Sequence, residues 1–154
     1  MIIISPYSKP TISDNKPSPK NYPYWPELIK IIREKMPEQY ILQVGVSGET
    51  DLGCDCFLQN LPLEVLKTLI KGCDIWISVD NFFHHLASII GKRGIVIFSL
   101  SDPLIFGDPN NINILKDRKY LRADQFNFWD NVQPNNDAFV EPEIIFETIS
   151  ECLR

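Results

Sequence analysis

The sequence predicts an α/β fold in which a doubly wound, mainly parallel sheet forms a single domain over residues 1–154. Apolar segments without polar alternation, such as Gly94–Phe98, indicate strands that are buried on both faces. They alternate with segments whose apolar residues recur at helical spacing, such as Asn81–Ile90. Strands and helices in alternation form right-handed βαβ units, and these build a parallel sheet. A chain of 154 residues fits one such domain.

Local signals set the order of the elements. Trp25-Pro26-Glu27 begins a helix with proline at its start and an acid in its first turn, and Pro37 ends it. Long polar segments at Tyr7 to about Pro23 and at Ser99 to about Asn111 are expected to be loops. The expected strands are Ile2–Ile4, Tyr40–Val46, Asp74–Val79 and Gly94–Phe98, and the expected helices begin near Trp25, Pro62, Asn81 and Pro142. This arrangement is Rossmann-like.

In a doubly wound sheet the ligand binds outside the carboxyl ends of the strands. The polar loops that follow the expected strands should therefore lie on one rim. These loops are Ser5–Lys20, Ser47–Asp51, Asp80–Asn81 and Ser99–Gly107. We expect the ligand site to be built from them.

The strand-to-helix turn at Asp80-Asn81 is the most informative of these loops. Both residues can cap the helix that follows, and free N–H groups together with the helix dipole favour a phosphate at such a turn. Asp80 could also serve as a cap without any ligand. His85 could contact a ligand or belong to the core, and His84 is expected to face solvent or a neighbouring loop.

Composition excludes several classes of function. A net charge of −5 and a pI near 5.0 argue against a nucleic-acid partner. No apolar stretch is long enough to span a membrane and Met1–Ile4 is too short for a signal peptide, so we expect a cytoplasmic protein. The four cysteines form no disulfide framework, and Cys54-Asp55-Cys56 with His84-His85 fits no usual zinc spacing. We therefore expect neither a metal nor another cofactor.

Several segments, taken in order, resemble the C-terminal, donor-binding half of glycosyltransferase family 9, the heptosyltransferase-like enzymes of the two-domain GT-B architecture. The best match is Val79–Ala87, which is similar to the family motif V-D-[ST]-G-x-x-H-x-A. Asp80 and His85 fall on motif positions, whereas Asn81 replaces the hydroxyl residue and Phe82 replaces the glycine. Weaker similarities lie at Ser5-Pro6, at Lys20 ahead of Trp25-Pro26, at Gly45 to Glu49, at Leu61–Asp74 and at Phe98 through Gly107.

The resemblance implies a nucleotide or nucleotide-sugar ligand. Its diphosphate would be held by Lys20, Asn81 and the N–H groups of Phe82 and Phe83, and its ribose by Glu49. Phe82, Phe126, Phe128 and Trp129 are expected in the core, with stacking over a base as the alternative. The candidate ligand-binding residues are Ser5, Lys20, Gly45, Ser47, Glu49, Asp80, Asn81, Phe82, Phe83, His85 and Ser101.

The sequence contains no counterpart of the family's N-terminal half, which carries the acceptor site and the catalytic carboxylate. Nor does it contain a P-loop, a Gly-x-Gly-x-x-Gly motif or an apparent nucleophile set, so the catalytic residues are unknown. Transfer of a sugar would need a partner chain or a homo-oligomer that completes the site. The alternative function is a non-catalytic protein that sequesters a nucleotide-derived signal, as a short phage-encoded relative that counters host defence would do.

Overall fold

The computed structural model describes residues 1–154, and all of its strands belong to one parallel sheet. The strands are β1 (Ile2–Ser5), β2 (Ile41–Gly45), β3 (Cys56–Gln59), β4 (Ile75–Val79), β5 (Ile95–Phe98) and β6 (Ile112–Leu115). Their order across the sheet is β3-β2-β1-β4-β5-β6, and every neighbouring pair is parallel. This is the doubly wound, Rossmann-like order, which confirms the predicted fold class.

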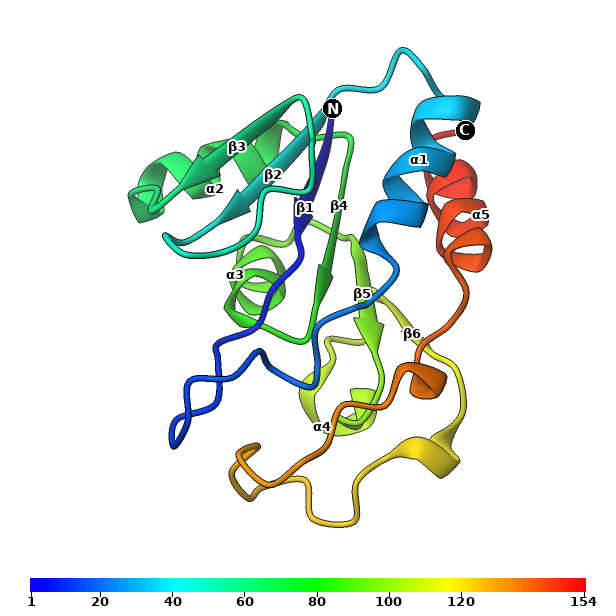
Figure 1. Ribbon diagram of the computed structural model, residues 1–154. Coiled ribbons are helices and arrows are strands. Elements are labelled where there is room, and N and C mark those ends of the chain that lie inside the picture. Colours follow the sequence, from blue (N-terminus) through cyan, green and yellow to red (C-terminus); the bar gives the residue numbers. More distant parts are fainter.

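Helices cover both faces of the sheet (Figure 1). Helices α1 (Trp25–Lys35) and α5 (Pro142–Cys152) pack together on one face, and α2 (Leu63–Gly72) and α3 (Phe82–Ile90) pack together on the other. The short helix α4 (Pro103–Phe106) and two 3₁₀ turns, at Arg118–Tyr120 and Asn136–Ala138, lie in the later connections. None of the helices combines the length and the apolar character needed to cross a bilayer. The four cysteines are free thiols.

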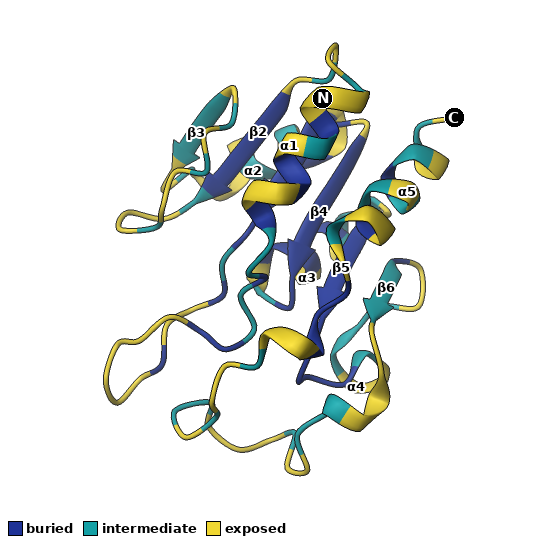
Figure 2. Cartoon of the chain, turned by 45° about the vertical axis from the view of Figure 1, so that its right-hand side comes forward, coloured by how far each residue is buried: buried dark blue, intermediate teal, exposed yellow.

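The central strands divide their side chains between two cores because successive strand residues point to opposite faces. In β1, Ile2 and Ile4 pack towards α1 and α5, whereas Ile3 packs towards α2 and α3. Figure 2 shows the middle strands as buried and the outer edge of β3 as exposed or half-buried. The run of isoleucines is thus apolar at every position because both faces of the sheet are covered.

The strand order reverses beside β1. The chain moves from β1 to β2 and β3 on one side, and then crosses to β4, β5 and β6 on the other side. The connections that leave β1 and β4 therefore diverge, and a crevice opens outside the carboxyl ends of these two strands. The turn at Asp80-Asn81 follows β4 and lies at this crevice.

Three elements were not expected from the sequence, which placed a loop over α4 and assigned no element at β3 or β6. β3 and β6 are four-residue strands at the two edges of the sheet, and all but one of their residues are half-buried. Edge strands lack the apolar run that marks a central strand, so hydrophobic pattern does not reveal them. α4 is a single turn, which is too short to show helical periodicity.

Candidate functional site

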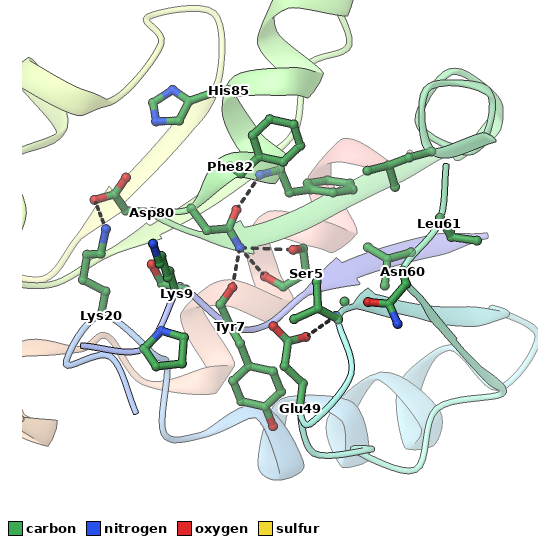
Figure 3. Close-up of a pocket in the computed structure, with 18 residues that line it drawn as sticks. Ser5, Tyr7, Lys9, Lys20, Glu49, Asn60, Leu61, Asp80, Phe82 and His85 are labelled. Carbon is green, nitrogen blue, oxygen red and sulfur yellow. Dashed lines mark hydrogen bonds and ion pairs between the residues drawn. The ribbon is translucent and has the colours of Figure 1, made fainter. Parts of the chain in front are cut away.

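A cavity of about 580 Å³ opens at the carboxyl ends of β1, β2 and β4 (Figure 3). It brings together residues from three of the four loops that the sequence placed on one rim, and the fourth loop, Ser99–Gly107, contributes none. Nine of the eleven predicted ligand-binding residues line it: Ser5, Lys20, Gly45, Glu49, Asp80, Asn81, Phe82, Phe83 and His85. The cavity therefore gathers most of the candidate ligand-binding residues in one place.

Asp80 is the buried anion of this site, with its side chain 7% exposed. Lys20 Nζ lies 3.1 Å from Asp80 Oδ2, and His84 Nε2 lies 3.2 Å from Oδ1. Burial by itself raises the pKa of the Asp80 carboxyl, but the hydrogen bond to His84, the charge of Lys20 and the nearby Ser101 hydroxyl outweigh it. These partners lower the pKa to about 2, so Asp80 is a carboxylate at neutral pH.

Lys20 is held in place although it belongs to a long loop. Its Nζ also lies 5.2 Å from the centre of the Trp129 ring, in a cation–π contact. The surrounding loop is fastened to the core, since Trp25 Nε1 donates to the Pro6 carbonyl and Ser8 N–H donates to Asn21 Oδ1. Lys20 therefore extends into the cavity from a loop that hydrogen bonds hold in place.

Asn81 caps α3 and ties the turn to the loop after β1. Its Oδ1 accepts a hydrogen bond from Phe83 N–H at 2.9 Å, and its Nδ2 donates to the carbonyls of Ser5 and Tyr7 and to Ser5 Oγ. These internal bonds occupy the amide of Asn81 and the N–H of Phe83. In this conformation neither the Asn81 amide nor the Phe83 N–H is free to bind a phosphate, as was expected of both. The Phe82 N–H is not bonded by the Asn81 cap.

Glu49 closes the side of the cavity next to β2. Its Oε2 accepts a hydrogen bond from Val46 N–H at 3.1 Å and lies directly over Gly45. A Cβ at Gly45 would lie 1.9 Å from that oxygen, so the glycine leaves the space that the carboxylate occupies. Burial raises the pKa of Glu49, and the Val46 hydrogen bond partly offsets this rise.

The two neighbouring histidines lie in different environments, and the environment of His84 differs from the one that the sequence suggested. His84 is fully buried against Asp80, whereas the neighbouring His85 is exposed and lines the cavity. Their rings lie together, with centroids 3.8 Å apart, and His84 Nδ1 has no hydrogen-bond partner. The expectation for His84 is wrong because position i+4 on the helix lies directly below Asp80, where it bonds the carboxylate. Partial burial of its ring and the neighbouring His84 lower the pKa of His85.

Three aromatic residues expected in the core are exposed instead. Phe82 is 66% exposed at the mouth of the cavity, and Phe126 and Phe128 are 81% and 72% exposed in a later loop. Trp129 is half-buried beside Lys20. Aromatic character alone predicted burial, but the two interior layers are already filled by residues of the strands and helices.

Two predicted residues lie outside the cavity lining. Ser47 is exposed and bonds Asn60, accepting from Asn60 Nδ2 through its hydroxyl. Ser101 is buried behind Asp80 and helps to lower its pKa without lining the cavity. Ser101 thus supports the site from inside the protein.

Sequence reasoning missed other residues that line the cavity, among them Tyr7, Lys9, Asn60 and Leu61. Tyr7 and Lys9 lie in the predicted rim loop after β1 but carry no motif. Asn60 and Leu61 follow β3, and recognition of that strand would have added them to the rim. Burial raises the pKa of the Tyr7 phenol, so the hydroxyl stays protonated and can donate a hydrogen bond.

Sequence comparison finds no matching family model and no matching curated protein. Three solved structures match with probability 1.00. They are Escherichia coli heptosyltransferase WaaC with ADP (TM-score 0.65, 18% identity), E. coli ADP-heptose LPS heptosyltransferase II (0.64, 14%) and WaaC with ADP-2-deoxy-2-fluoro heptose (0.63, 17%).

The matches cover 98%, 99% and 97% of this chain but 43%, 46% and 42% of those proteins. The chain therefore spans less than half the length of the heptosyltransferases whose fold it shares. At these identities the likeness concerns the fold, and it confirms the resemblance to heptosyltransferases that the sequence indicated.

Proposed function

We propose that this chain binds a nucleotide or a nucleotide sugar in the cavity at the carboxyl ends of β1, β2 and β4, with the phosphates between Lys20 and the start of α3. The observation that carries the proposal is the convergence of a largely buried cation, a helix N-terminus and a carboxylate on one cavity. Its volume of about 580 Å³ suits a ligand of this size.

The phosphate end of the cavity is its electropositive end. Lys20 and Lys9 both line the cavity near the N-terminus of α3, whose dipole adds partial positive charge (Figure 3). Asp80 neutralises Lys20 when no ligand is bound, because the two atoms lie only 3.1 Å apart. A bound phosphate would contact Lys20 while the lysine stays paired with Asp80. The lysine side chain would not need to move to make this contact.

The opposite side of the cavity offers hydrogen-bond partners for a sugar ring. Glu49 presents a carboxylate that can accept from ribose hydroxyls, and Tyr7 and Asn60 add polar groups beside it. Val44, Leu61 and Leu66 supply an apolar wall. A nucleoside placed with its phosphate at Lys20 would meet these groups with its ribose and base.

Sugar transfer would require an acceptor site and a general base in addition to this cavity. Both carboxylates that line it are engaged, Asp80 by Lys20 and His84 and Glu49 by Val46. We therefore propose that any transfer depends on a further domain or a second copy of the chain facing the cavity. Sedimentation of the purified protein with and without nucleotide measures whether such a copy assembles.

Calorimetric titration of ADP, UDP, GDP and ADP-glucose into the protein tests the binding proposal. We expect a nucleoside diphosphate to bind, and Lys20→Gln to weaken it about ten-fold or more, as loss of a charge-assisted contact does. Lys30→Gln is the matched control, because Lys30 is an exposed lysine on α1 outside the cavity. Unchanged affinity in Lys20→Gln, or no binding of any of the four ligands, would contradict the proposal.

A further inference from the structure

A second, smaller cavity of about 210 Å³ adjoins the first. Ser8, Lys9, Pro10 and Lys20 line both cavities and form the wall between them. The far side of the second cavity is aromatic, with Phe126, Phe128 and Trp129. The fold likeness and the strand-to-helix motif do not account for this aromatic groove.

The exposed aromatic rings of this groove are carried by a braced loop. Arg122 donates from its guanidinium to the carbonyls of Asp124, Asn127 and Phe128 while it lies over the Trp129 ring, 4.1 Å from the ring centre. Gln125 fastens the loop to the end of β5 through hydrogen bonds with Leu100 and Asp102. The loop therefore presents Phe126 and Phe128 to solvent in a defined place.

The loop is also tied to the segment that carries Lys9 and Lys20. Ser13 N–H donates to Asp130 Oδ1 at 2.5 Å, and Asp130 lines the second cavity. Burying an exposed phenylalanine face against a planar or pyranose ring is favourable, whereas leaving two such faces in water on an ordered loop is costly. The groove thus has the character of a ring-binding site next to two cations.

We propose that the aromatic groove holds a second ring, a sugar or a base, at the far end of the same phosphate-bridged ligand, so that the phosphates lie over the Lys9 and Lys20 wall and one ring occupies each cavity. This inference rests on the proposed nucleotide binding. The wall shared by the two cavities supports this inference. Its two lysines can pair with the phosphates that bridge a two-ended ligand, and the volume of the second cavity suits a single ring.

Titration with one-ended and two-ended probes tests the inference. ADP provides one ring, whereas ADP-glucose adds a sugar and diadenosine diphosphate adds a second base. We expect at least one two-ended probe to bind about ten-fold more tightly than ADP, within the range of a single stacked ring. The double variant Phe126→Ala/Phe128→Ala should remove this gain and leave the affinity for ADP unchanged.

Controls separate this inference from the proposed function. Ile89→Ala removes a side chain that is 85% exposed on α3 and lies outside both cavities, so it should change neither affinity. Trp129 fluorescence adds a local readout, because Trp25 and Trp76 are fully buried, and a two-ended probe should change it more than ADP does. The groove inference is overturned, and the proposed nucleotide binding stands, if ADP binds but neither two-ended probe binds more tightly than ADP. The same holds if the double variant weakens the binding of all probes equally. If no probe binds, both proposals fail.

Discussion

Two consecutive strand-to-helix turns of this protein have nearly the same local chemistry but different surroundings. The β4–α3 turn and the β5–α4 turn each follow a buried strand. In each turn the side-chain oxygen of the N-cap residue accepts a hydrogen bond from the backbone N–H two residues later in the chain. Asn81 accepts from Phe83 N–H at 2.9 Å, and Asp102 accepts from Leu104 N–H at 3.0 Å. The caps alone do not distinguish a ligand site from a connection.

The charged partners of the two turns make the difference. At β4–α3 the carboxylate of Asp80 is paired with Lys20, which is 15% exposed and lines the cavity. At β5–α4 the carboxylate of Asp102 is paired through both oxygens with Arg118, which is 56% exposed. The first pair brings a cation to a cavity, and the second fastens a surface loop.

Sheet topology explains why only one of the turns lies at the cavity. β4 neighbours β1, where the strand order reverses and the connections diverge, whereas β5 lies one strand further along. The loop after β1 can therefore reach over β4 with Lys20 and leave space beneath it. Position in the sheet, rather than the sequence of the turn, decides which turn lies at the cavity.

The largest expected difference between the two turns is the loss of stability when each carboxylate charge is removed. Asp80→Asn should lower the free energy of unfolding by about 3 kcal/mol, because it leaves the largely buried Lys20 without its counter-ion. Asp102→Asn should cost about 1 kcal/mol or less, since Arg118 is solvated and asparagine retains the cap. Urea unfolding of both variants measures the difference, and equal costs would remove the distinction between the turns.

Acid titration gives a smaller effect that is specific to Asp80. Its pKa of about 2 lies below the value near 3.9 expected in the unfolded chain, so the stabilisation is complete above pH 5 and is lost as the pH falls from about 4 towards 2. The stability gap between the wild type and Asp80→Asn should therefore shrink by about 2 kcal/mol over that interval. A gap independent of pH would show that the carboxylate is not held ionised.

The smallest effect concerns the hydrogen bonds that tie the first turn to the loop after β1. Asn81→Ser keeps a capping oxygen but removes the Nδ2 hydrogen bonds to Ser5 and Tyr7, and should cost about 1 kcal/mol. Asp102→Ser keeps its cap in the same way and loses the pair with Arg118. Hydrogen exchange should show faster opening of the loop after β1 in Asn81→Ser alone. Protection that is unchanged in both variants would show that Asn81 is only a cap.

Much of the fold could be predicted because the central strands and the long helices carry strong periodic signals. The isoleucines of β1, the strand Ile75–Val79 and the helix Phe82–Ile90 were all placed within a few residues of their bounds. The parallel orientation of the strands followed from the alternation of strands and helices. β3, α4 and β6 escaped prediction because short edge strands and single turns bury too little to need an apolar pattern.

What the sequence by itself determined is the rim: loops that follow parallel strands meet at one edge of a sheet, so Lys20, Glu49 and Asp80 could be expected together. Only the tertiary structure decided what each side chain does there. It turned Asn81 inward as cap and brace, buried His84 rather than His85, and exposed Phe126 and Phe128. These outcomes depend on the hydrogen-bond partners and the free space within a few ångströms of each side chain. Residues that are distant in the chain provide the partners and enclose the space.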